Sequence, residues 1–241
     1  MSNSPLVSYT KLSPNHSGER NHKIDTITIH CMAGNMSVES CGALFAKASR
    51  KASSNYGIGS DGRIALYVDE ENRSWATSSP SNDHRAVTIE VANNGGAPDW
   101  PVSSKAYAAL LDLVTDICKR NGIKELKWKG DKTLVGNVEQ QNMTVHRWFA
   151  AKACPGNYLY ERHGAIADEV NRRLGAMPAA FKPYTVRVTI TDLNIRQGPS
   201  TKYGRIGYIS PGVYTIVEEK DGWGKLKSGA GWISLVYAKR L

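Results

Sequence analysis

The sequence predicts a layered α/β domain followed by a small all-β domain. In residues 1–175, short apolar runs alternate with segments of helical periodicity, which indicates a mixed central sheet flanked by helices. Residues 176–183 are rich in Ala and Pro and interrupt this pattern, as a linker does. From residue 184 to residue 241, short alternating strands are separated by turns such as Lys220-Asp221-Gly222, which is typical of a small barrel.

Four runs of apolar and β-branched residues predict strands in the first domain, at 24–30, 55–58, 64–68 and 86–91. The first run ends at His30, so this imidazole is expected at the carboxyl end of a buried strand. Open α/β sheets bind their ligands at that edge. The last run contains Glu90 among apolar residues, where an unpaired carboxylate would be costly.

Helical spacing of apolar residues predicts three helices in the same domain. The first spans about 37–50, and the last spans 158–174. The middle helix begins at a cap supplied by Ser103 or Ser104 and ends within 119–122, where Asn-Gly follows two basic residues.

Net charge, apolar run length and the N-terminal segment limit the classes of partner and location that the sequence predicts. The net charge is +9, of which the first 180 residues carry +3 and the last 61 carry +6. A basic surface attracts anionic polymers, but no nucleic-acid-binding motif accompanies the charge, so a nucleic-acid partner is not expected. No apolar run approaches the roughly 18 residues of a membrane span, so membrane anchoring is not expected. The start lacks the features of a signal peptide, which predicts synthesis in the cytoplasm and release by another route.

The four cysteines are Cys31, Cys41, Cys118 and Cys154. A chain without an export signal normally keeps its thiols reduced, and Cys41 and Cys118 fall on apolar helix faces. A Cys31–Cys41 disulfide remains an open alternative at this stage.

The segment from His146 to Gly156 concentrates reactive groups, with an imidazole, the Lys152 ammonium and the Cys154 thiol within nine residues. Neutral imidazole and thiolate are zinc ligands, and a catalytic zinc site has three protein ligands and one open position. His146 and Cys154 supply two, and His30 is the best candidate for the third. The sequence therefore predicts an open His30/His146/Cys154 zinc site.

Several motifs in family order resemble the zinc-dependent N-acetylmuramoyl-L-alanine amidases of type 2, which are related to peptidoglycan-recognition proteins. They are Thr28-Ile29-His30, Asn55-Tyr56-Gly57-Ile58, Ile89-Glu90-Val91, and His146 with Lys152-Ala153-Cys154-Pro155-Gly156. The resemblance implies Zn²⁺ as cofactor and hydrolysis of the amide between N-acetylmuramic acid and L-alanine. It also implies that Lys152 stabilises the oxyanion and Glu90 acts as general base. Some relatives rely more on a tyrosine, and Tyr56 is matched to it, to orient the water or hold substrate.

The second domain resembles the bacterial SH3 fold, a peptidoglycan-binding module of cell-wall hydrolases. The motifs are Leu193–Ser200, Asp221-Gly222-Trp223 and Gly231-Trp232-Ile233. Four aromatic residues are the candidate wall-binding groups: Trp223, Trp232, Tyr203 and Tyr208.

Together these features predict a phage endolysin that is made in the host cytoplasm and acts on Gram-positive peptidoglycan after release. One alternative is a recognition protein of the same fold without catalysis. The other is a host autolysin or recycling amidase, which the wall-binding tail and the missing export signal disfavour.

Overall fold

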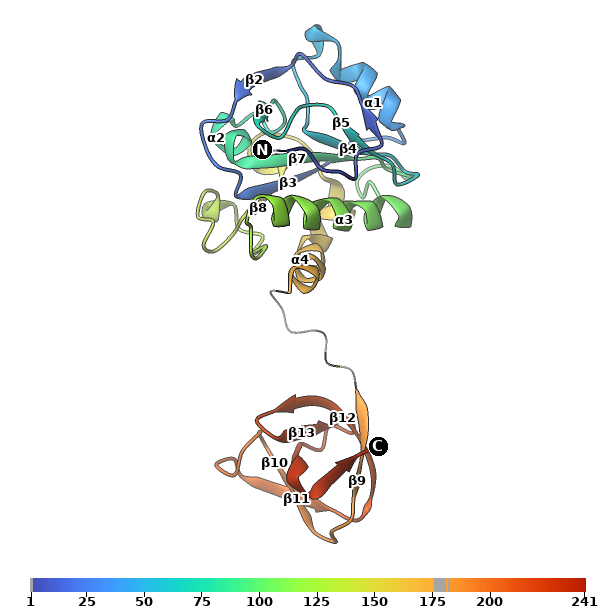
Figure 1. The fold of residues 1–241 in the computed structure, drawn as a ribbon, viewed down its shortest axis with the longest axis vertical. Helices are drawn as coiled ribbons and strands as arrows, with labels where there is room; N and C mark the ends of the chain where they lie inside the picture. The colour runs from blue at the N-terminus through green and yellow to red at the C-terminus, as the bar shows by residue number, and fades with distance from the viewer. Residues whose placement is uncertain (1, 176–180, 182) are drawn as a thin grey trace. The chain divides into compact units, whose positions relative to one another are not determined.

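The computed structural model describes residues 2–175, 181 and 183–241. The chain divides into two compact units, residues 1–177 and 178–241 (Figure 1). The linker expected at 176–183 lies outside the described residues, apart from Phe181 and Pro183. No helix in the described part of the chain is both long enough and apolar enough to cross a bilayer.

The first unit is built on a mixed sheet, with the strand order β1-β5-β4-β7-β3-β8. Neighbouring pairs β4–β7, β7–β3 and β3–β8 are parallel, whereas β5 runs antiparallel to β4. This confirms the predicted mixed sheet. The strands are β1 (Tyr9–Thr10), β3 (Thr26–Cys31), β4 (Tyr56–Ile58), β5 (Ile64–Leu66), β7 (Ala86–Val91) and β8 (Met143–Thr144), with a separate pair of β2 (His16–Glu19) and β6 (Asn72–Ser74).

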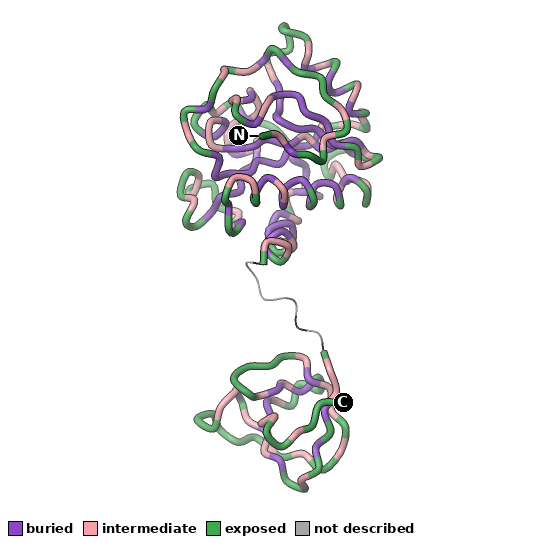
Figure 2. The backbone as a smooth tube through the Cα atoms, in the orientation of Figure 1, coloured by how far each residue is buried: buried purple, intermediate pink, exposed green. Residues whose placement is uncertain are grey.

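Strand alternation divides the side chains between two faces of this sheet. Ile29, Val87 and Ile89 belong to the main apolar core together with residues of α3 (Ser104–Arg120) and α4 (Gly156–Leu174). Their neighbours in sequence point to the opposite face, where α1 (Val38–Phe45) lies. Figure 2 shows the buried backbone concentrated in these strands and in the sheet-facing sides of the helices. His30 and Glu90 therefore face away from α3 and α4.

Two helix boundaries differ from the sequence prediction. The helix predicted at 37–50 ends at Phe45 and is followed by the 3-10 turn Ala48–Arg50, after which Lys51 has a left-handed φ of 54°. The last helix starts at Gly156, whose φ of 82° and lack of a side chain allow a close approach of Asp99. Carbonyl oxygens of Pro98 and Asp99 accept hydrogen bonds from Asn157 and Tyr158, so a distant loop satisfies the first amides of α4.

The short helix α2 (Pro80–Arg85) precedes β7. Its N-cap residue is Ser79, whose side chain accepts a hydrogen bond from the Asn82 amide. Asp83 of this helix accepts hydrogen bonds from the backbone amides of Ala76 and Thr77. The helix thereby fixes the loop that precedes it.

The second unit is all-β and consistent with the predicted SH3-like fold. Its strand order is β11-β10-β14-β13-β12-β9-β15, and the neighbouring strands in this order pair antiparallel. Its small core contains Val186, Ile216 and Ile233. The strands are β9 (Tyr184–Val188), β10 (Leu193–Arg196), β11 (Arg205–Ile209), β12 (Gly212–Lys220), β13 (Trp223–Leu226), β14 (Trp232–Ser234) and β15 (Ala238–Arg240).

Candidate metal centre and cleft

Two adjacent parallel strands bring His30 and Glu90 together. His30 of β3 is the register partner of Glu90 of β7, so both side chains leave the sheet on the same face near the strands' carboxyl ends. Nδ1 of His30 lies 3.9 Å from Oε1 of Glu90. The His30 ring is fully buried, which fixes its position.

The loop between β8 and α4 carries the other two groups. β8 pairs with β3, and the 3-10 turn His146–Trp148 follows it directly, so His146 emerges next to His30. The Arg147 amide donates to the Cys154 carbonyl at 3.1 Å, and the Arg147 guanidinium donates to the Ala153 carbonyl at 2.6 Å. These bonds close the loop, so His146 and Cys154 face one point although they are eight positions apart in sequence.

His30, His146 and Cys154 form a group that fits a metal ion. One ligand atom from each lies within 4.8 Å of the others, and Sγ of Cys154 is 3.4 Å from Nδ1 of His30. Zinc bonds of about 2.1 Å to nitrogen and 2.3 Å to sulfur at a tetrahedral angle separate these two atoms by about 3.6 Å. Within residues 2–175, the buried atoms His146 Nε2 and Glu90 Oε2 lack hydrogen-bond partners, as expected where polar groups are arranged for a ligand.

The electrostatic environment keeps both imidazoles in the form that binds metals. Burial, with a smaller contribution from His146, lowers the pKa of His30 to about 3. Burial and the nearby Lys152 ammonium lower the pKa of His146. Both rings are therefore neutral at pH 7, with a lone pair available.

The pKa of Glu90 is shifted in the opposite direction, upward. Burial, reinforced by Cys31, raises the pKa of the Glu90 carboxyl well above its ordinary value, and Arg50 partly offsets this effect. Hydrogen bonding with Cys31 and burial likewise raise the pKa of the Cys154 thiol. A carboxyl group with a raised pKa is suited to accept and return a proton near neutral pH.

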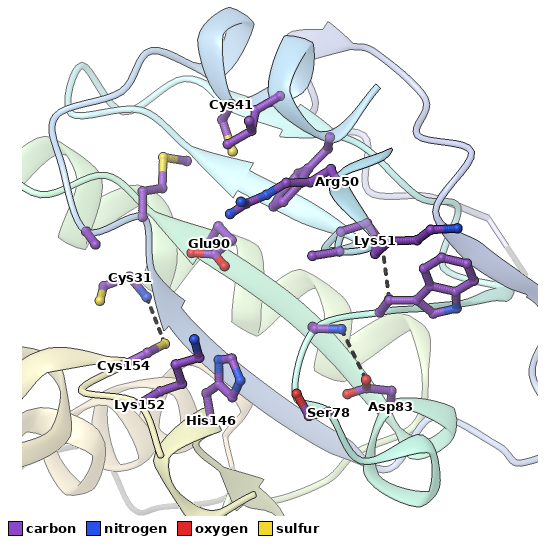
Figure 3. A pocket seen from close by; sticks show the side chains of 18 of the residues that line it. Cys31, Cys41, Arg50, Lys51, Ser78, Asp83, Glu90, His146, Lys152 and Cys154 are labelled. Atoms are coloured by element: carbon purple, nitrogen blue, oxygen red, sulfur yellow. Dashed lines mark hydrogen bonds between the residues drawn. The ribbon is translucent and has the colours of Figure 1, made fainter. Parts of the chain in front are cut away.

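Glu90, His146 and Cys154 line one side of a cleft of about 810 Å³ (Figure 3). Lys152 extends into the cleft beside His146 and Cys154. Sequence reasoning did not identify the cationic residues Arg50, Lys51 and Arg73, which also line the cleft. They come from the turn after α1 and from β6, and no sequence pattern connects them with the metal segment.

Tyr56 is not part of this cleft, which corrects the sequence-based prediction. Its register partner is Ile89, so its ring lies in the core beneath the sheet, whereas Gly57 is the partner of Glu90. The Tyr56 hydroxyl donates to Oε1 of Glu70 at 2.5 Å and accepts from the Ser4 amide at 2.9 Å. Both interactions of this hydroxyl are therefore made on the opposite face of the sheet from His30 and Glu90.

The predicted aromatic residues of the second unit have different exposures. Cross-strand register places Trp223, Trp232 and Tyr208 on the same sheet face as Arg196. Tyr208 is 68% exposed and Tyr203 is 48% exposed, but Trp232 is only 7% exposed. The Lys225 ammonium lies 5.8 Å from the centre of the Trp232 ring. The Trp232 ring is thus almost completely covered by its neighbours, while Tyr203 and Tyr208 are accessible to a ligand.

The fold and the cleft define a layered α/β domain with a candidate metal site at the carboxyl edge of its sheet. A family model described as N-acetylmuramoyl-L-alanine amidase matches residues 20–157, and the chain belongs to this family of peptidoglycan amidases. The matched segment contains all three candidate ligands, Glu90 and Lys152.

Solved structures agree with this fold. A mutant endolysin from Bacillus subtilis is 16% identical, and the similarity covers 67% of this chain and 97% of that chain at a TM-score of 0.50. A selenomethionine AmpD derivative is 18% identical, with 69% and 99% covered at a TM-score of 0.50. At these identities the likeness concerns the fold. No curated protein sequence matches the chain.

Proposed function

We propose that the chain is a zinc-dependent hydrolase that cleaves the amide between N-acetylmuramic acid and the L-alanine of the stem peptide. The observation that carries this proposal is the convergence of His30, His146 and Cys154 within 4.8 Å, at a cleft that His146, Cys154, Glu90 and Lys152 line. Two neutral imidazoles and one thiolate leave a fourth position open for water or substrate, as in catalytic zinc sites.

Zinc, when bound, supplies a Lewis acid that polarises the amide carbonyl and makes water a nucleophile near neutral pH. His30, His146 and Cys154 would hold the ion. The full burial of His30 and the Arg147 bonds that close the ligand loop fix the positions of these side chains.

The remaining two groups handle charge and protons. The Lys152 ammonium lies beside the metal ligands and stabilises the negative oxygen that develops as the amide carbonyl is attacked. A carboxylate oxygen of Glu90 accepts a proton from the attacking water and returns it to the leaving amine. Its position 3.9 Å from His30 places it at the edge of the ligand set rather than within it.

The second unit, in this proposal, holds the enzyme on Gram-positive peptidoglycan through the face that contains Tyr208, Trp223 and Arg196, with Tyr203 beside it. Trp232 supports that face from beneath. Linking a weak binding module to an enzyme raises the enzyme's effective concentration at the polymer without a new contact in the cleft. An endolysin role follows from this modular arrangement and forms part of the same proposal.

The deciding experiment is mass analysis of purified Gram-positive peptidoglycan after incubation with the full chain, with and without a chelator. We expect stem peptides with a free L-alanine amino terminus, released only when zinc is present. Wall binding without new amino termini in a zinc-replete sample would contradict hydrolysis and leave a recognition protein. New termini in the presence of chelator would contradict the role of the metal.

A further inference from the structure

A row of exposed side chains crosses the second unit on the neighbouring strands β12, β9 and β15 (Figure 1). Arg187 of β9 is the register partner of Val213 on β12 and of Lys239 on β15. All three are exposed, whereas Val186 and Val188, on either side of Arg187 in the chain, belong to the core. Because side chains alternate along a strand, the row that contains Arg187 points outward.

Arg187 and Lys239 are like charges in directly opposing positions. Opposing residues of an antiparallel pair have Cβ atoms about 4.5–5.5 Å apart, and like charges there destabilise the pair. A lysine on an edge strand prevents unwanted strand pairing, but β9 lies between β12 and β15, so this role does not account for Arg187. An anion bound between the two side chains would remove the repulsion.

The acidic side chains of the second unit do not balance this row. Glu218 forms a salt bridge with Lys225 at 3.2 Å. Glu219 accepts a hydrogen bond from the Tyr184 hydroxyl at 2.5 Å. The other acidic residues of the unit lie in the turns that follow β9 and β12, and they are Asp192 and Asp221. Within residues 183–241, neither member of the opposed basic pair has a salt-bridge partner.

Two hydroxyl groups occupy the next outward row. Thr185 of β9 and Thr215 of β12 are register partners, two positions from the basic row, and both are half-buried. The backbone amide of Lys227 donates to the Thr215 carbonyl at 2.9 Å, and Lys227 is exposed. A third cationic residue therefore follows directly beside the hydroxyl pair.

This combination of groups fits a phosphodiester chain. A guanidinium donates two parallel hydrogen bonds to phosphate oxygens, and an ammonium is a compact point charge. Threonine hydroxyls add neutral donors. Because neighbouring strands lie about 4.8 Å apart, the surface from β12 to β15 spans about 10 Å, so an extended chain that crosses it contacts several donors at once.

We propose that the outer surface of β12, β9 and β15 binds phosphodiester polymers of the Gram-positive cell wall. The residues that form this polymer site are Arg187, Lys239, Lys227, Thr185 and Thr215. The site is separate from the proposed peptidoglycan-binding face, which is on β10, β11, β13 and β14. The cell wall as the source of the polymer rests on the proposed function, whereas the binding itself needs neither zinc nor the cleft.

A second ligand on the same wall changes how the enzyme is held. The phosphodiester polymer is not the proposed substrate, so cleavage of stem peptides does not remove it. Binding of the polymer site therefore keeps the effective concentration of the enzyme high as hydrolysis proceeds.

The test titrates the full chain with soluble poly(glycerol phosphate) and measures the affinity by calorimetry. We expect the affinity to fall about fivefold in Arg187→Gln and in Lys239→Gln, and about 25-fold in the double variant, as one and two cations are withdrawn from an anionic surface. Unchanged affinity in the double variant would overturn the proposal. Urea unfolding checks that each variant is folded, and these exposed positions lie outside the core.

The matched control is Lys202→Gln, which removes the same charge from an exposed turn before β11. It should bind the polymer within twofold of the parent chain. A loss equal to that of Arg187→Gln would show attraction by net charge alone and would overturn the site. A single-stranded DNA with the same number of phosphates is a second probe. Tighter binding of this DNA than of poly(glycerol phosphate) would overturn the wall polymer as the ligand.

Retention on purified wall separates this proposal from the proposed function. Hydrofluoric acid removes phosphodiester polymers from the wall and leaves peptidoglycan. We expect the Arg187→Gln/Lys239→Gln variant to be retained less than the parent chain on untreated wall and equally on treated wall. Equal losses on both walls would overturn the phosphodiester ligand. Release of L-alanine amino termini from treated wall tests the proposed hydrolysis independently, because the polymer is absent there.

Discussion

Glu90 and His30 occupy partner positions on adjacent parallel strands, with 3.9 Å between a carboxylate oxygen and the imidazole Nδ1. The pairing of β7 with β3 therefore sets the distance between the proposed proton acceptor and the proposed metal site. The sheet itself holds this geometry, and no loop is needed to maintain it.

Replacement of Glu90 by Gln keeps the shape of the side chain and removes its ability to accept a proton. We expect kcat to fall by about 10²- to 10⁴-fold, the range that general bases contribute, while zinc content stays unchanged. Turnover and metal analysis on the same preparation check this. An activity within threefold of the parent chain would exclude Glu90 as the base.

Cys154→Ser and Lys152→Ala are expected to reduce hydrolysis for different reasons. Cys154→Ser removes a proposed ligand, so both zinc and activity should be lost. Lys152→Ala should retain zinc and lose about 3 kcal/mol of transition-state stabilisation, or roughly 10²-fold in kcat. Metal analysis distinguishes them, and full zinc occupancy in Cys154→Ser would show that the third ligand is a different residue.

Tyr56→Phe tests the reassignment of this tyrosine to the core. Its hydroxyl donates a hydrogen bond to Glu70 and accepts one from the Ser4 amide. The Glu70 carboxylate also accepts hydrogen bonds from Arg120 and Asn121. Loss of the hydroxyl should lower the free energy of unfolding by about 1–2 kcal/mol and leave kcat and zinc content within twofold. Urea unfolding and turnover measure the two effects. A large fall in kcat at unchanged stability would restore Tyr56 to the catalytic site.

The buried His163 should make the free energy of unfolding depend on pH. It is buried in α4, where its Nδ1 donates to the Leu159 carbonyl at 2.7 Å, and burial lowers its pKa to about 4. Since the unfolded chain binds the proton more tightly, stability contributed by the neutral ring is present above about pH 6.5 and is lost as pH falls towards 4. The expected slope from this residue is about 1.4 kcal/mol per pH unit.

The control for this prediction is His163→Asn, which offers a similarly placed donor but does not titrate. Urea unfolding of the metal-free chains between pH 4 and 7 should show the slope reduced by that amount in the variant. The depressed pKa values of His30 and His146 act in the same direction in both chains, so the difference isolates His163. Equal slopes would contradict a buried neutral ring.

Tyr208 is the exposed aromatic residue that best tests the proposed wall-binding face. Tyr208→Ala should weaken retention on purified wall by about fivefold, equivalent to about 1 kcal/mol for one aromatic contact, without changing the unfolding transition. Val236→Ala, which truncates another highly exposed side chain of the same unit, serves as the control. If both variants bind as the parent chain does, the binding face lies elsewhere.

The sequence was sufficient to predict the two kinds of domain, the central strands and the grouping of His30 with His146 and Cys154. These depended on local periodicity and on residue types with few alternative uses. The sequence could not place the ring of Tyr56, because its face depends on the register between β4 and β7, and a shift of one residue reverses every side chain. Arg50 and Arg73 could not be found because tertiary packing alone brings their segments to the cleft.

The hydrogen bonds that the Pro98 and Asp99 carbonyls accept from the first amides of α4 have a consequence for the order of folding. Cys154 lies two residues before that helix start and 124 residues from His30 in sequence. The ligand set therefore forms only after contacts of very long sequence separation have closed, and such contacts slow folding and form late. Metal-binding capacity during refolding should report completion of the whole N-terminal unit rather than the appearance of its first strands.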